Sequence, residues 1–324
     1  MILTVTLNAA LDVTWDVDSL RPHTSHRVDA AHERAGGKGI NVARVLTFLG
    51  HAPVATGLVG GPTGRLIRAG LRTAGIRDAF LDVSGDARRT LTVVSLDDGD
   101  ATVFNGRGPH VDPAEWELFC RHYASLLAGV RVAVLCGSTP PGLPTDAYAR
   151  LIRMAAAAGV ITVLDTSGPA LLAALDARPD VIKPNAAEIT AATGCEDLLE
   201  AAAELQARGA RTVVASAGAE GMHAITPDST WRARPPERLS GNPTGAGDAC
   251  VAAIAAGQEA GSGWPDILRE AVALSAAAVP CPVAGDVEAA AYHRFRPEVS
   301  VEEGHAAHPQ LPPARAPHPP HLAH

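Results

Sequence analysis

Apolar residues along this chain gather in short, nearly unbroken runs, which alternate with longer segments of helical periodicity. The runs lie at residues 2–7, 54–59, 130–136, 160–165, 181–182 and 211–215. Strands that are apolar at every position are typical of a parallel sheet, because crossover helices cover both of its faces. The pattern therefore predicts a doubly wound α/β domain whose sheet is mostly parallel.

The predicted helices fill the intervals between these strands. A glycine-rich segment at residues 35–39 introduces the first helix, which Gly50 closes. The other helices are expected at residues 63–74, 113–128, 144–158, 169–176, 186–193, 196–208, 246–260 and 265–280. A short β pair is expected near residues 222–233.

Two segments depart from this alternation. Residues 13–34 contain short β-type runs separated by polar residues, and they show no helical period. Residues 90–104 form two runs around Asp97-Asp98-Gly99-Asp100, which is a hairpin signal. We expect the two segments to pair as a small sheet apart from the main body, a β lid at about residues 10–34 and 88–106.

Composition excludes several classes of protein. The formal net charge of −8 gives no basic footprint for nucleic acid. No apolar run reaches 18 residues, so the sequence predicts neither a signal peptide nor a membrane span, and we expect a cytoplasmic protein. The five cysteines are scattered without a Cys-x-x-Cys pair, which is typical of reduced thiols and not of disulfides or metal ligands.

The composition changes near the C-terminus. Residues 1–292 are expected to form the α/β domain with its lid, and residues 293–324, rich in Pro and His, a disordered tail. A transition metal could bind the five tail histidines, but a solvated tail is the preferred interpretation. Those histidines are His305, His308, His318, His321 and His324.

The most informative stretch is residues 241–253, where glycines precede an Ala-rich helix. Gly245 and Gly247 permit a tight turn, so main-chain N–H groups and the positive end of the helix dipole can converge on an anion. Asp248 stands at the same place and could accept the proton of an alcohol, as phosphoryl transfer requires. The structural alternative is a helix N-terminus with an acidic residue in its first turn.

Polar or glycine-rich segments also follow the predicted strands at six places, which describes a cleft that holds a polyol and a nucleotide. Two other phosphate-binding signatures fail on spacing. Gly36-Gly37-Lys38-Gly39 lacks the Ser/Thr of a Walker P-loop, and Gly245-Ala246-Gly247 lacks the third glycine of a dinucleotide fingerprint. The second failure argues against a nicotinamide-dependent dehydrogenase.

Six motifs, in order along about residues 1–290, resemble those of the ribokinase/PfkB carbohydrate kinases. They are Asn8-Ala9-Ala10-Leu11-Asp12, Gly36-Gly37-Lys38-Gly39-Ile40-Asn41-Val42-Ala43, Gly137-Ser138-Thr139-Pro140-Pro141-Gly142, Asp165-Thr166-Ser167-Gly168, Lys183-Pro184-Asn185-Ala186-Ala187-Glu188 and Gly245-Ala246-Gly247-Asp248. The pattern is most similar to the 1-phosphofructokinase and tagatose-6-phosphate kinase branch. The resemblance implies a ribokinase-like three-layer αβα fold with a β lid, and phosphorylation of a sugar hydroxyl that uses ATP and Mg²⁺.

The resemblance also implies roles for individual residues. Asp248 would be the catalytic base, and the backbone N–H groups of Gly245, Ala246 and Gly247 would form an anion hole. The sugar would meet Asp12, Gly37 and Asn41. For Asp12, the structural alternative is a carboxylate that caps a turn.

Arginines of the lid would bind the phosphate that the substrate already carries. In the phosphosugar branch, the residue that matches Arg88 has this role, and Arg27, Arg107 and Ser138 could assist. Lys38 is ambiguous, because relatives that act on unphosphorylated sugars share its motif. The structural alternative for the arginines is solvated charge on an exposed sheet.

On the nucleotide side, Lys183 and Asn185 would meet the phosphates, and Glu188 would hold Mg²⁺ through water. Ser216, Gly218 and Gly221 would line the adenosine pocket. Each of these could instead be an ordinary cap or turn. The sequence departs from the family pattern at Ala9, at Ala217 and at residues 279–283, and the last of these departures affects the purine contacts.

The function expected from the resemblance is transfer of the γ-phosphate of ATP to fructose 1-phosphate, which yields fructose 1,6-bisphosphate. The alternatives are a kinase of tagatose 6-phosphate, fructose 6-phosphate or an unphosphorylated sugar or nucleoside, and a sensor that binds these ligands without turnover. Partners other than the small-molecule substrates are not expected, apart from a second copy that pairs through the lid.

Overall fold

A mixed sheet forms the centre of the computed structural model, which describes residues 1–28, 31–97, 100–237 and 244–304. Its strands in spatial order are β15 (Ser300–Gly304), β14 (Thr230–Arg234), β13 (Met222–Ile225), β12 (Thr212–Ser216), β11 (Val181–Ile182), β10 (Ile161–Asp165), β9 (Val132–Cys136), β1 (Ile2–Thr6), β4 (Val54–Val59) and β5 (Arg77–Asp78), with β6 (Leu81–Asp82) beside β4. Pairing is parallel from β5 to β12 and antiparallel from β12 to β15.

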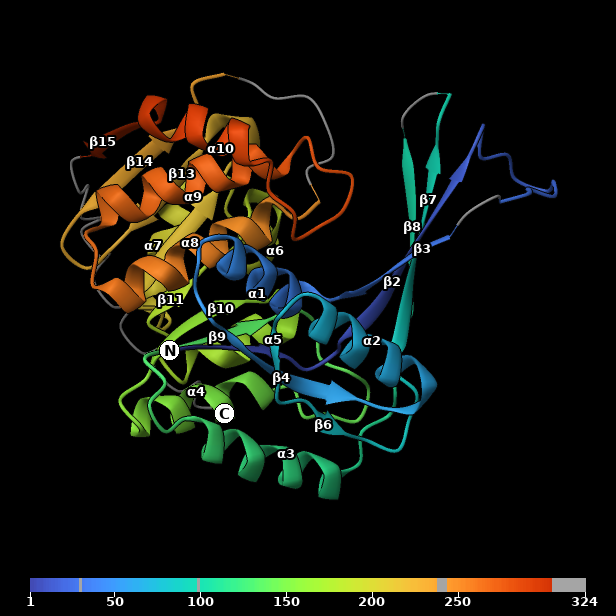
Figure 1. Cartoon of the computed structure of the whole chain (residues 1–324). Helices are drawn as coiled ribbons and strands as arrows, with labels where there is room; N and C mark the ends of the chain where they lie inside the picture. Colours follow the sequence, from blue (N-terminus) through green and yellow to red (C-terminus); the bar gives the residue numbers. More distant parts are fainter. Residues whose placement is uncertain (29–30, 98–99, 238–243, 305–324) are drawn as a thin grey trace, which may run out of the picture.

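Helices cover both faces of this sheet (Figure 1). One face carries α1 (Lys38–Phe48), α2 (Gly61–Thr73), α8 (Ala246–Ala260) and α9 (Trp264–Ala278). The other face carries α3 (Pro113–Leu126), α4 (Ala147–Ala157), α5 (Gly168–Leu175), α6 (Ala186–Thr193) and α7 (Leu198–Ala207). The predicted doubly wound αβα architecture is therefore confirmed, and most predicted elements agree with the observed ones within three residues.

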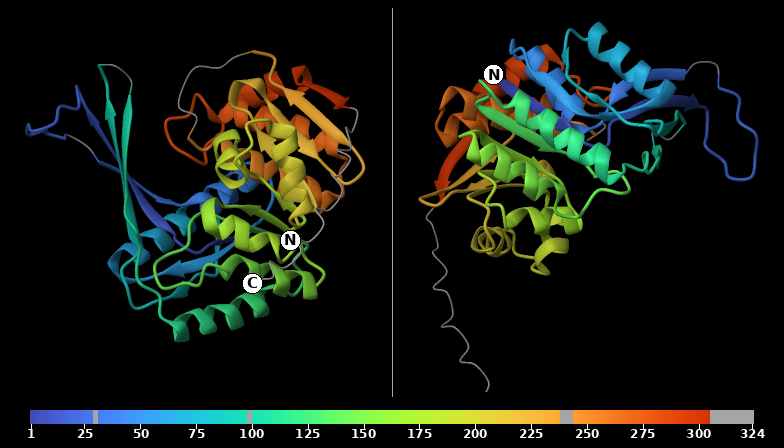
Figure 2. Two further views of the ribbon diagram at one scale, coloured as in Figure 1. Left: turned by 180° about the vertical axis from the view of Figure 1, so that it is seen from behind. Right: turned by 90° about the horizontal axis from the view of Figure 1, so that it is seen from below.

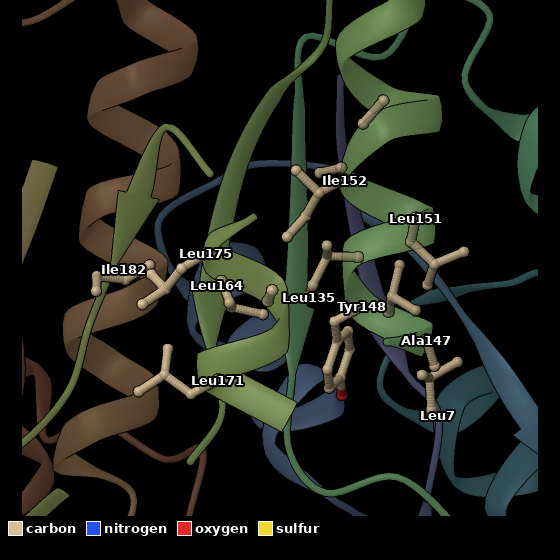
Figure 3. Packing of buried hydrophobic residues seen from close by; sticks show 14 of the residues in the cluster. Leu7, Leu135, Ala147, Tyr148, Leu151, Ile152, Leu164, Leu171, Leu175 and Ile182 are labelled. Atoms are coloured by element: carbon tan, nitrogen blue, oxygen red, sulfur yellow. The ribbon is translucent and has the colours of Figure 1, made fainter. Parts of the chain in front are cut away.

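The core between α4, α5 and the sheet is aliphatic around one large aromatic ring (Figure 3). Tyr148 on α4 is fully buried, and its hydroxyl lies 2.9 Å from the carbonyl oxygens of both Cys136 and Gly137. A buried tyrosine needs such a partner for its hydroxyl. Here the contact fixes the end of β9, from which the loop of Ser138 departs.

Four strands form a separate sheet that projects from the body (Figures 1 and 2). Their order is β3 (Ala31–Gly36), β2 (Ala10–Val17), β7 (Arg88–Ser95) and β8 (Ala101–Asn105). The expected pairing of the early segment with the later hairpin is confirmed, because β2 runs parallel to β7. Residues 98–99 of the hairpin lie outside the described residues.

The two faces of this lid differ in chemistry, because successive side chains of a strand alternate between faces. Asp12, Thr14 and Thr90 lie on the face that lines the main cavity. Leu91 pairs with Val13 and Phe104 on the opposite face, where apolar side chains predominate. Near the body this outer face packs on α2, whereas farther out Trp15 and Phe104 are exposed by 37% and 54%.

The folded chain continues beyond the boundary expected at residue 292. Helix α10 (Ala289–Phe295) is followed by the 3₁₀ turn η2 (Arg296–Glu298) and by β15, which pairs antiparallel with β14. Tyr292, Phe295 and Val299 are buried against the sheet and α9. These apolar residues, spaced between Arg, Pro and His, anchor a segment that the overall composition wrongly assigns to the tail. The tail histidines lie outside the described residues.

Two expectations about composition can be compared with the described part of the chain. No helix in it is long and apolar enough to cross a bilayer. All five cysteines are free, and the described residues hold no cluster of three or more metal-ligating side chains.

Candidate active site

The loops that follow the central strands open into one large cavity of about 1610 Å³. Chain order reverses at β1, which lies between β4 and β9. Ligands of open α/β sheets bind at such a switch point, beyond the carboxyl ends of the strands. Every predicted site residue except Arg27 lines this cavity, and the polar face of the lid closes one side of it.

Helix α8 begins at the edge of this cavity. Gly245 is its N-cap with φ of 94°, and a Cβ there would lie 2.8 Å from the Cα of Ala284. Both the backbone conformation and the close approach therefore require glycine. The first N–H groups of α8 and the positive end of its dipole lie beside the cavity, as expected of an anion site. Residues 241–243 of the predicted motif lie outside the described residues.

Asp248, in the first turn of α8, is 6% exposed and accepts a hydrogen bond of 2.9 Å from Nδ2 of Asn41 at its Oδ2. Burial raises the pKa of Asp248 to about 7, and the nearby charge of Asp165 adds to this effect. The hydrogen bond from Asn41 and the charge of Lys38 act in the opposite direction. Asp248 can therefore hold or release a proton near neutral pH.

A second buried carboxylate, Asp165, was not among the predicted site residues. Its Oδ1 lies 3.1 Å from Nζ of Lys38 and 3.7 Å from Nζ of Lys183. Burial alone would lower the pKa of both lysines, but the nearby acidic groups, Asp165 first among them, together outweigh burial and raise it. The sequence offers one signal for Asp165, an acidic residue at the end of an apolar strand, within the motif Asp165-Thr166-Ser167-Gly168. The sequence alone assigns this residue no role.

Asp12 lies on β2 opposite Arg34 of β3. A Cβ on the neighbouring Gly36 would lie 1.8 Å from Oδ2 of Asp12, so this carboxylate occupies the space that a side chain at position 36 would fill. Burial raises the pKa of Asp12, whereas a hydrogen bond from Thr90 and the charge of Arg88 lower it in part. Glycine at position 36 thus allows a carboxylate at the junction of lid and body.

Arg88 begins β7 at the same junction. Its Nε donates a hydrogen bond of 3.0 Å to the carbonyl oxygen of Asn8, while Nη1 is 3.5 Å from Thr90 Oγ1 and from Asn105 Oδ1. The two longer contacts are weak at that distance. Burial lowers the pKa of Arg88 and the charge of Asp12 opposes this. One edge of the guanidinium is therefore anchored, and the other can bind an anion.

Asn8 connects three segments at one side of the cavity. Its Nδ2 donates hydrogen bonds to the carbonyl oxygen of Arg107 at 3.1 Å and to Oγ of Ser138 at 3.2 Å. The first of these contacts is with the main chain of Arg107, and the arginine itself lines the cavity. Asn8 appeared in a quoted motif but was given no role from the sequence.

Asn185 and Glu188 form a capping box at the start of α6. Oδ1 of Asn185 accepts a hydrogen bond of 2.8 Å from the Glu188 N–H, and Oε2 of Glu188 accepts one of 2.9 Å from the Asn185 N–H. The structural alternative for this pair is therefore present in full. Both residues also line the cavity, so the cap places a carboxylate there.

The other three residues that the sequence assigns to the nucleotide side lie at the end of β12. Ser216 forms a bridge with Asn185, and Gly218 and Gly221 have φ of 57° and 93° around the 3₁₀ turn η1 (Gly218–Glu220). A Cβ at Gly221 would lie 2.0 Å from the carbonyl oxygen of Ala233. All three line the cavity.

Arg27 is the one predicted site residue that the structure does not bring to the cavity of its own chain. It is exposed in the connection between β2 and β3, and it is absent from the cavity lining. The lid projects away from the body (Figure 2), and this connection extends from its outer end.

Comparison with known proteins decides the family. The model of the pfkB family carbohydrate kinases matches residues 4–289. The chain belongs to this family. It is 35% identical over 265 residues to a tagatose-6-phosphate kinase of Staphylococcus epidermidis, covering 79% of this chain and 85% of that protein.

Solved structures of PfkB-type kinases agree with this assignment. Phosphofructokinase-2 of Escherichia coli, in complex with fructose-6-phosphate, has a TM-score of 0.83 and 26% identity over 92% of this chain and 98% of its own. A Thermotoga maritima protein named as a possible 1-phosphofructokinase has a TM-score of 0.85 and 26% identity, over 94% and 99%. The fold of this PfkB kinase is ribokinase-like, as expected.

As a PfkB carbohydrate kinase, the protein is a phosphotransferase that uses ATP and Mg²⁺ with an alcohol group as acceptor. The cavity suits these partners: the start of α8, Lys38 and Lys183 supply positive charge for phosphate groups. Glu188 supplies a carboxylate oxygen, which is the kind of ligand that Mg²⁺ prefers.

Proposed function

We propose that this kinase transfers the γ-phosphate of ATP to a ketohexose phosphate, with fructose 1-phosphate as the preferred acceptor and fructose 1,6-bisphosphate as the product. The observation that carries the proposal is the distribution of charge in the cavity. Arg88 and Asp12 lie at the lid junction, and Asp248 lies at the start of α8 beside Asn41. A phosphosugar therefore finds a cation for its phosphate and a base for its hydroxyl in one cavity.

Asp248 is the proposed general base. Deprotonated, it accepts the proton of the acceptor hydroxyl as the oxygen attacks phosphorus. The hydrogen bond from Asn41 orients the carboxylate and leaves its second oxygen for the substrate. A pKa of about 7 suits this task, because a base is most effective when its pKa is near the working pH.

The proposed anion hole consists of the N–H groups of Gly245, Ala246 and Gly247. One preorganised donor of this kind contributes about 2.7–4 kcal/mol to a transition state, whereas the dipole of a surface helix contributes about 0.3–1 kcal/mol. Lys183 and Asn185 would bind the phosphates of the nucleotide. Glu188 would hold Mg²⁺ through water, and the ion would neutralise charge on the phosphates.

The sugar would bind between the lid and α1. Asp12 and Asn41 would bind sugar hydroxyls, and the main chain at Gly37 allows the ring to approach closely. Arg88, with Ser138, would bind the phosphate that the sugar already carries. Lys38, whose Nζ lies 3.1 Å from Oδ1 of Asp165, would instead bind the transferred phosphate. On the nucleotide side, Ser216, Gly218 and Gly221 would line the adenosine pocket.

The choice among ketohexose phosphates depends on how the ring lies. Fructose 1-phosphate and fructose 6-phosphate carry a phosphate at one end of the furanose ring and a primary hydroxyl at the other. A cavity with a cation at one end and a base at the other can in principle accept either orientation. The relatives carry the names of tagatose-6-phosphate kinase and of phosphofructokinases, so each of these acceptors belongs in the test.

The test is a panel of acceptors with ATP and Mg²⁺, compared by kcat/KM. We expect fructose 1-phosphate to rank first, and Arg88→Ala to raise the KM for the phosphosugar by about tenfold or more, because a charge-assisted contact is lost. Arg208→Ala is the matched control, since Arg208 is exposed at the end of α7 and pairs with Glu204. Equal use of unphosphorylated sugars, or an unchanged KM in Arg88→Ala, would contradict the phosphosugar proposal.

The base is tested separately with Asp248→Asn, which keeps the shape of the side chain and removes its charge. Turnover, followed as ADP release, should fall by at least about a hundredfold. If the variant keeps its rate, Asp248 is not the base.

We further propose that two copies pair through the outer face of the lid. That face carries Leu11, Val13, Leu91 and Val93 next to the ion pair of Glu33 and Arg89, and it leaves Trp15 and Phe104 exposed. An exposed apolar strip on a projecting sheet is a common interface between subunits.

A further inference from the structure

A buried carboxylate between two lysines of the cavity has so far no part in the reaction. Asp165 ends β10 and is only 1% exposed. Lys38 reaches its Oδ1 from α1, at 3.1 Å, and Lys183 reaches the same oxygen from the end of β11, at 3.7 Å. Its other oxygen, Oδ2, is buried and has no hydrogen-bond partner among the described residues.

Two ammonium groups that share one oxygen atom lie close enough to repel each other. Lys183 is only 4% exposed, so water screens this repulsion poorly. The carboxylate between them compensates one of the two charges and leaves a net positive charge beside the start of α8. Gly247 belongs to the same arrangement, because a Cβ there would lie 3.5 Å from Nζ of Lys183.

We propose that Asp165 is a positioning residue, which holds the ammonium groups of Lys38 and Lys183 together where they meet the transferred phosphate. The inference rests on the proposed function, since it assumes that both lysines bind phosphate in the proposed reaction. Asp165 acts through the lysines and need not touch the substrate. Without it, the two cations would separate, and the cavity would lose its concentrated positive charge.

Asp165 also acts on the proposed base through its charge. Asp248 is surrounded by Asp165 at the end of β10, by Lys38 and Asn41 on α1, and by Lys183 after β11. The nearby thiols of Cys136 and Cys250 stay neutral, because burial raises the pKa of both. Since Asp165 raises the pKa of Asp248, removal of its charge should lower that pKa.

The experiment compares wild type with Asp165→Asn in steady-state kinetics over a range of pH. We expect the KM for Mg–ATP to rise by about tenfold or more, and the acid limb of the kcat profile to move to lower pH by roughly half a unit or more. A residue that only stabilised the fold would change Tm and the amount of active enzyme, but it would leave the acid limb in place. Asp165→Glu keeps the charge and should restore the acid limb, with an intermediate KM.

Asp180→Asn is the matched control. Asp180 directly precedes β11, at the end of the β10–β11 pair that lies opposite Asp165. Its carboxylate accepts hydrogen bonds of 2.9 and 3.0 Å from the main-chain N–H and the hydroxyl of Thr162. The Asp180→Asn variant should have a lower Tm, with an unchanged KM for Mg–ATP and an unchanged acid limb of the kcat profile. An unchanged KM and acid limb in Asp165→Asn would overturn the inference.

Two further variants keep the inference testable. If Asp165→Asn does not fold, Lys38→Met tests the same cluster, because loss of a cation should move the acid limb to higher pH; an unmoved limb would count against the inference. Asp248→Asn separates this inference from the proposed function. If Asp248→Asn is inactive while Asp165→Asn behaves as wild type, only the role of Asp165 is wrong. If Asp248→Asn is active, the proposed base is wrong.

Discussion

Burial and charge act against each other at the carboxyl group of Asp248. A carboxylate inside a protein is costly, and the fold compensates part of that cost with Asn41 and two lysines. The remaining cost is what keeps the pKa of Asp248 near 7. A surface carboxylate would be ionised throughout the neutral range but would be a weaker base. The same desolvation therefore reduces stability and favours the proposed role of Asp248 as a general base.

This trade-off predicts how Asp248→Asn changes stability. In the unfolded chain the group titrates near its ordinary pKa of about 3.9, whereas in the folded protein it titrates near 7. Stability from the raised pKa is fully present below pH 4 and is lost as the pH rises through 7, with about 1.4 kcal/mol per unit of difference. Relative to wild type, Asp248→Asn should therefore gain up to a few kcal/mol in free energy of unfolding between pH 4 and pH 8. Urea denaturation at both pH values measures this.

If the difference in free energy of unfolding between Asp248→Asn and wild type is the same at pH 4 and pH 8, the carboxyl group of Asp248 is not desolvated. The comparison is between two proteins at each pH, so the titration of all other groups cancels to first order.

At the scale of residues, most members of the candidate site could be expected from sequence motifs, whereas Asp165 is recognised only from its contacts in the structure. The positions of Asp12, Asn41 and Asp248 at the cavity could be expected, because each stands in a recognisable motif that follows a predicted strand or begins a helix. Asp165 was not predictable, since its meaning depends on Lys38 and Lys183 reaching the same oxygen from two separate elements. No local pattern carries that information.

Among the elements, β3 shows how a strand can make room for a functional group on its neighbour. Gly36 ends this strand, directly before the N-cap of α1 at Gly37, whose φ is 100°. The carboxylate of Asp12 lies where a side chain at position 36 would be. The glycine pair thus serves two purposes, because Gly37 allows the turn into the helix and Gly36 leaves space for the carboxylate of Asp12.

Gly36→Ala should therefore impair sugar binding specifically. A Cβ at 1.8 Å from Oδ2 of Asp12 must displace that carboxylate, so we expect kcat/KM for the sugar phosphate to fall by about tenfold or more, with the KM for ATP within about twofold of wild type. Gly263→Ala is the control: its φ of −70° suits any residue, and its Cβ would meet only Pro265 at 3.6 Å. A parallel rise in both KM values would show a general loss of structure instead.

Element boundaries illustrate what the pattern of apolar residues could and could not predict. The central strands were found because each is a continuous apolar run between glycine-rich loops. Helix α10 and strand β15 were missed, because only Tyr292, Phe295 and Val299 are buried there among charged and proline residues. Three anchors suffice in the structure, because α9 and β14 provide a ready surface. That surface is invisible in a local window of sequence.

For the molecule as a whole, the two faces of the lid have different surroundings. The polar face closes the cavity, and the apolar face is only partly covered by α2. A sheet of four strands that projects from its domain gains little burial by itself. Pairing of two lids would cover the apolar face and restrict the motion of the polar face. Dimer formation would then affect the geometry of the proposed sugar site.

Phe104→Asp should therefore separate the proposed dimer. A charge in the middle of an apolar interface is costly to desolvate, so sedimentation should show monomers in place of dimers, and the KM for the sugar phosphate should rise. Leu199→Asp is the control, because Leu199 is an exposed leucine on α7, far from the lid in sequence and structure. Monomeric wild-type protein at micromolar concentration would rule out this assembly.

The outer part of the lid carries Trp15, while the other tryptophans, Trp116, Trp231 and Trp264, belong to the body. The lid thus has a built-in optical reporter. The part of the fluorescence that is lost in Trp15→Phe comes from the lid alone. Its emission wavelength and its quenching by iodide report the solvent exposure of that surface. Titrations with sugar or with protein concentration could be read out from that signal without any attached dye.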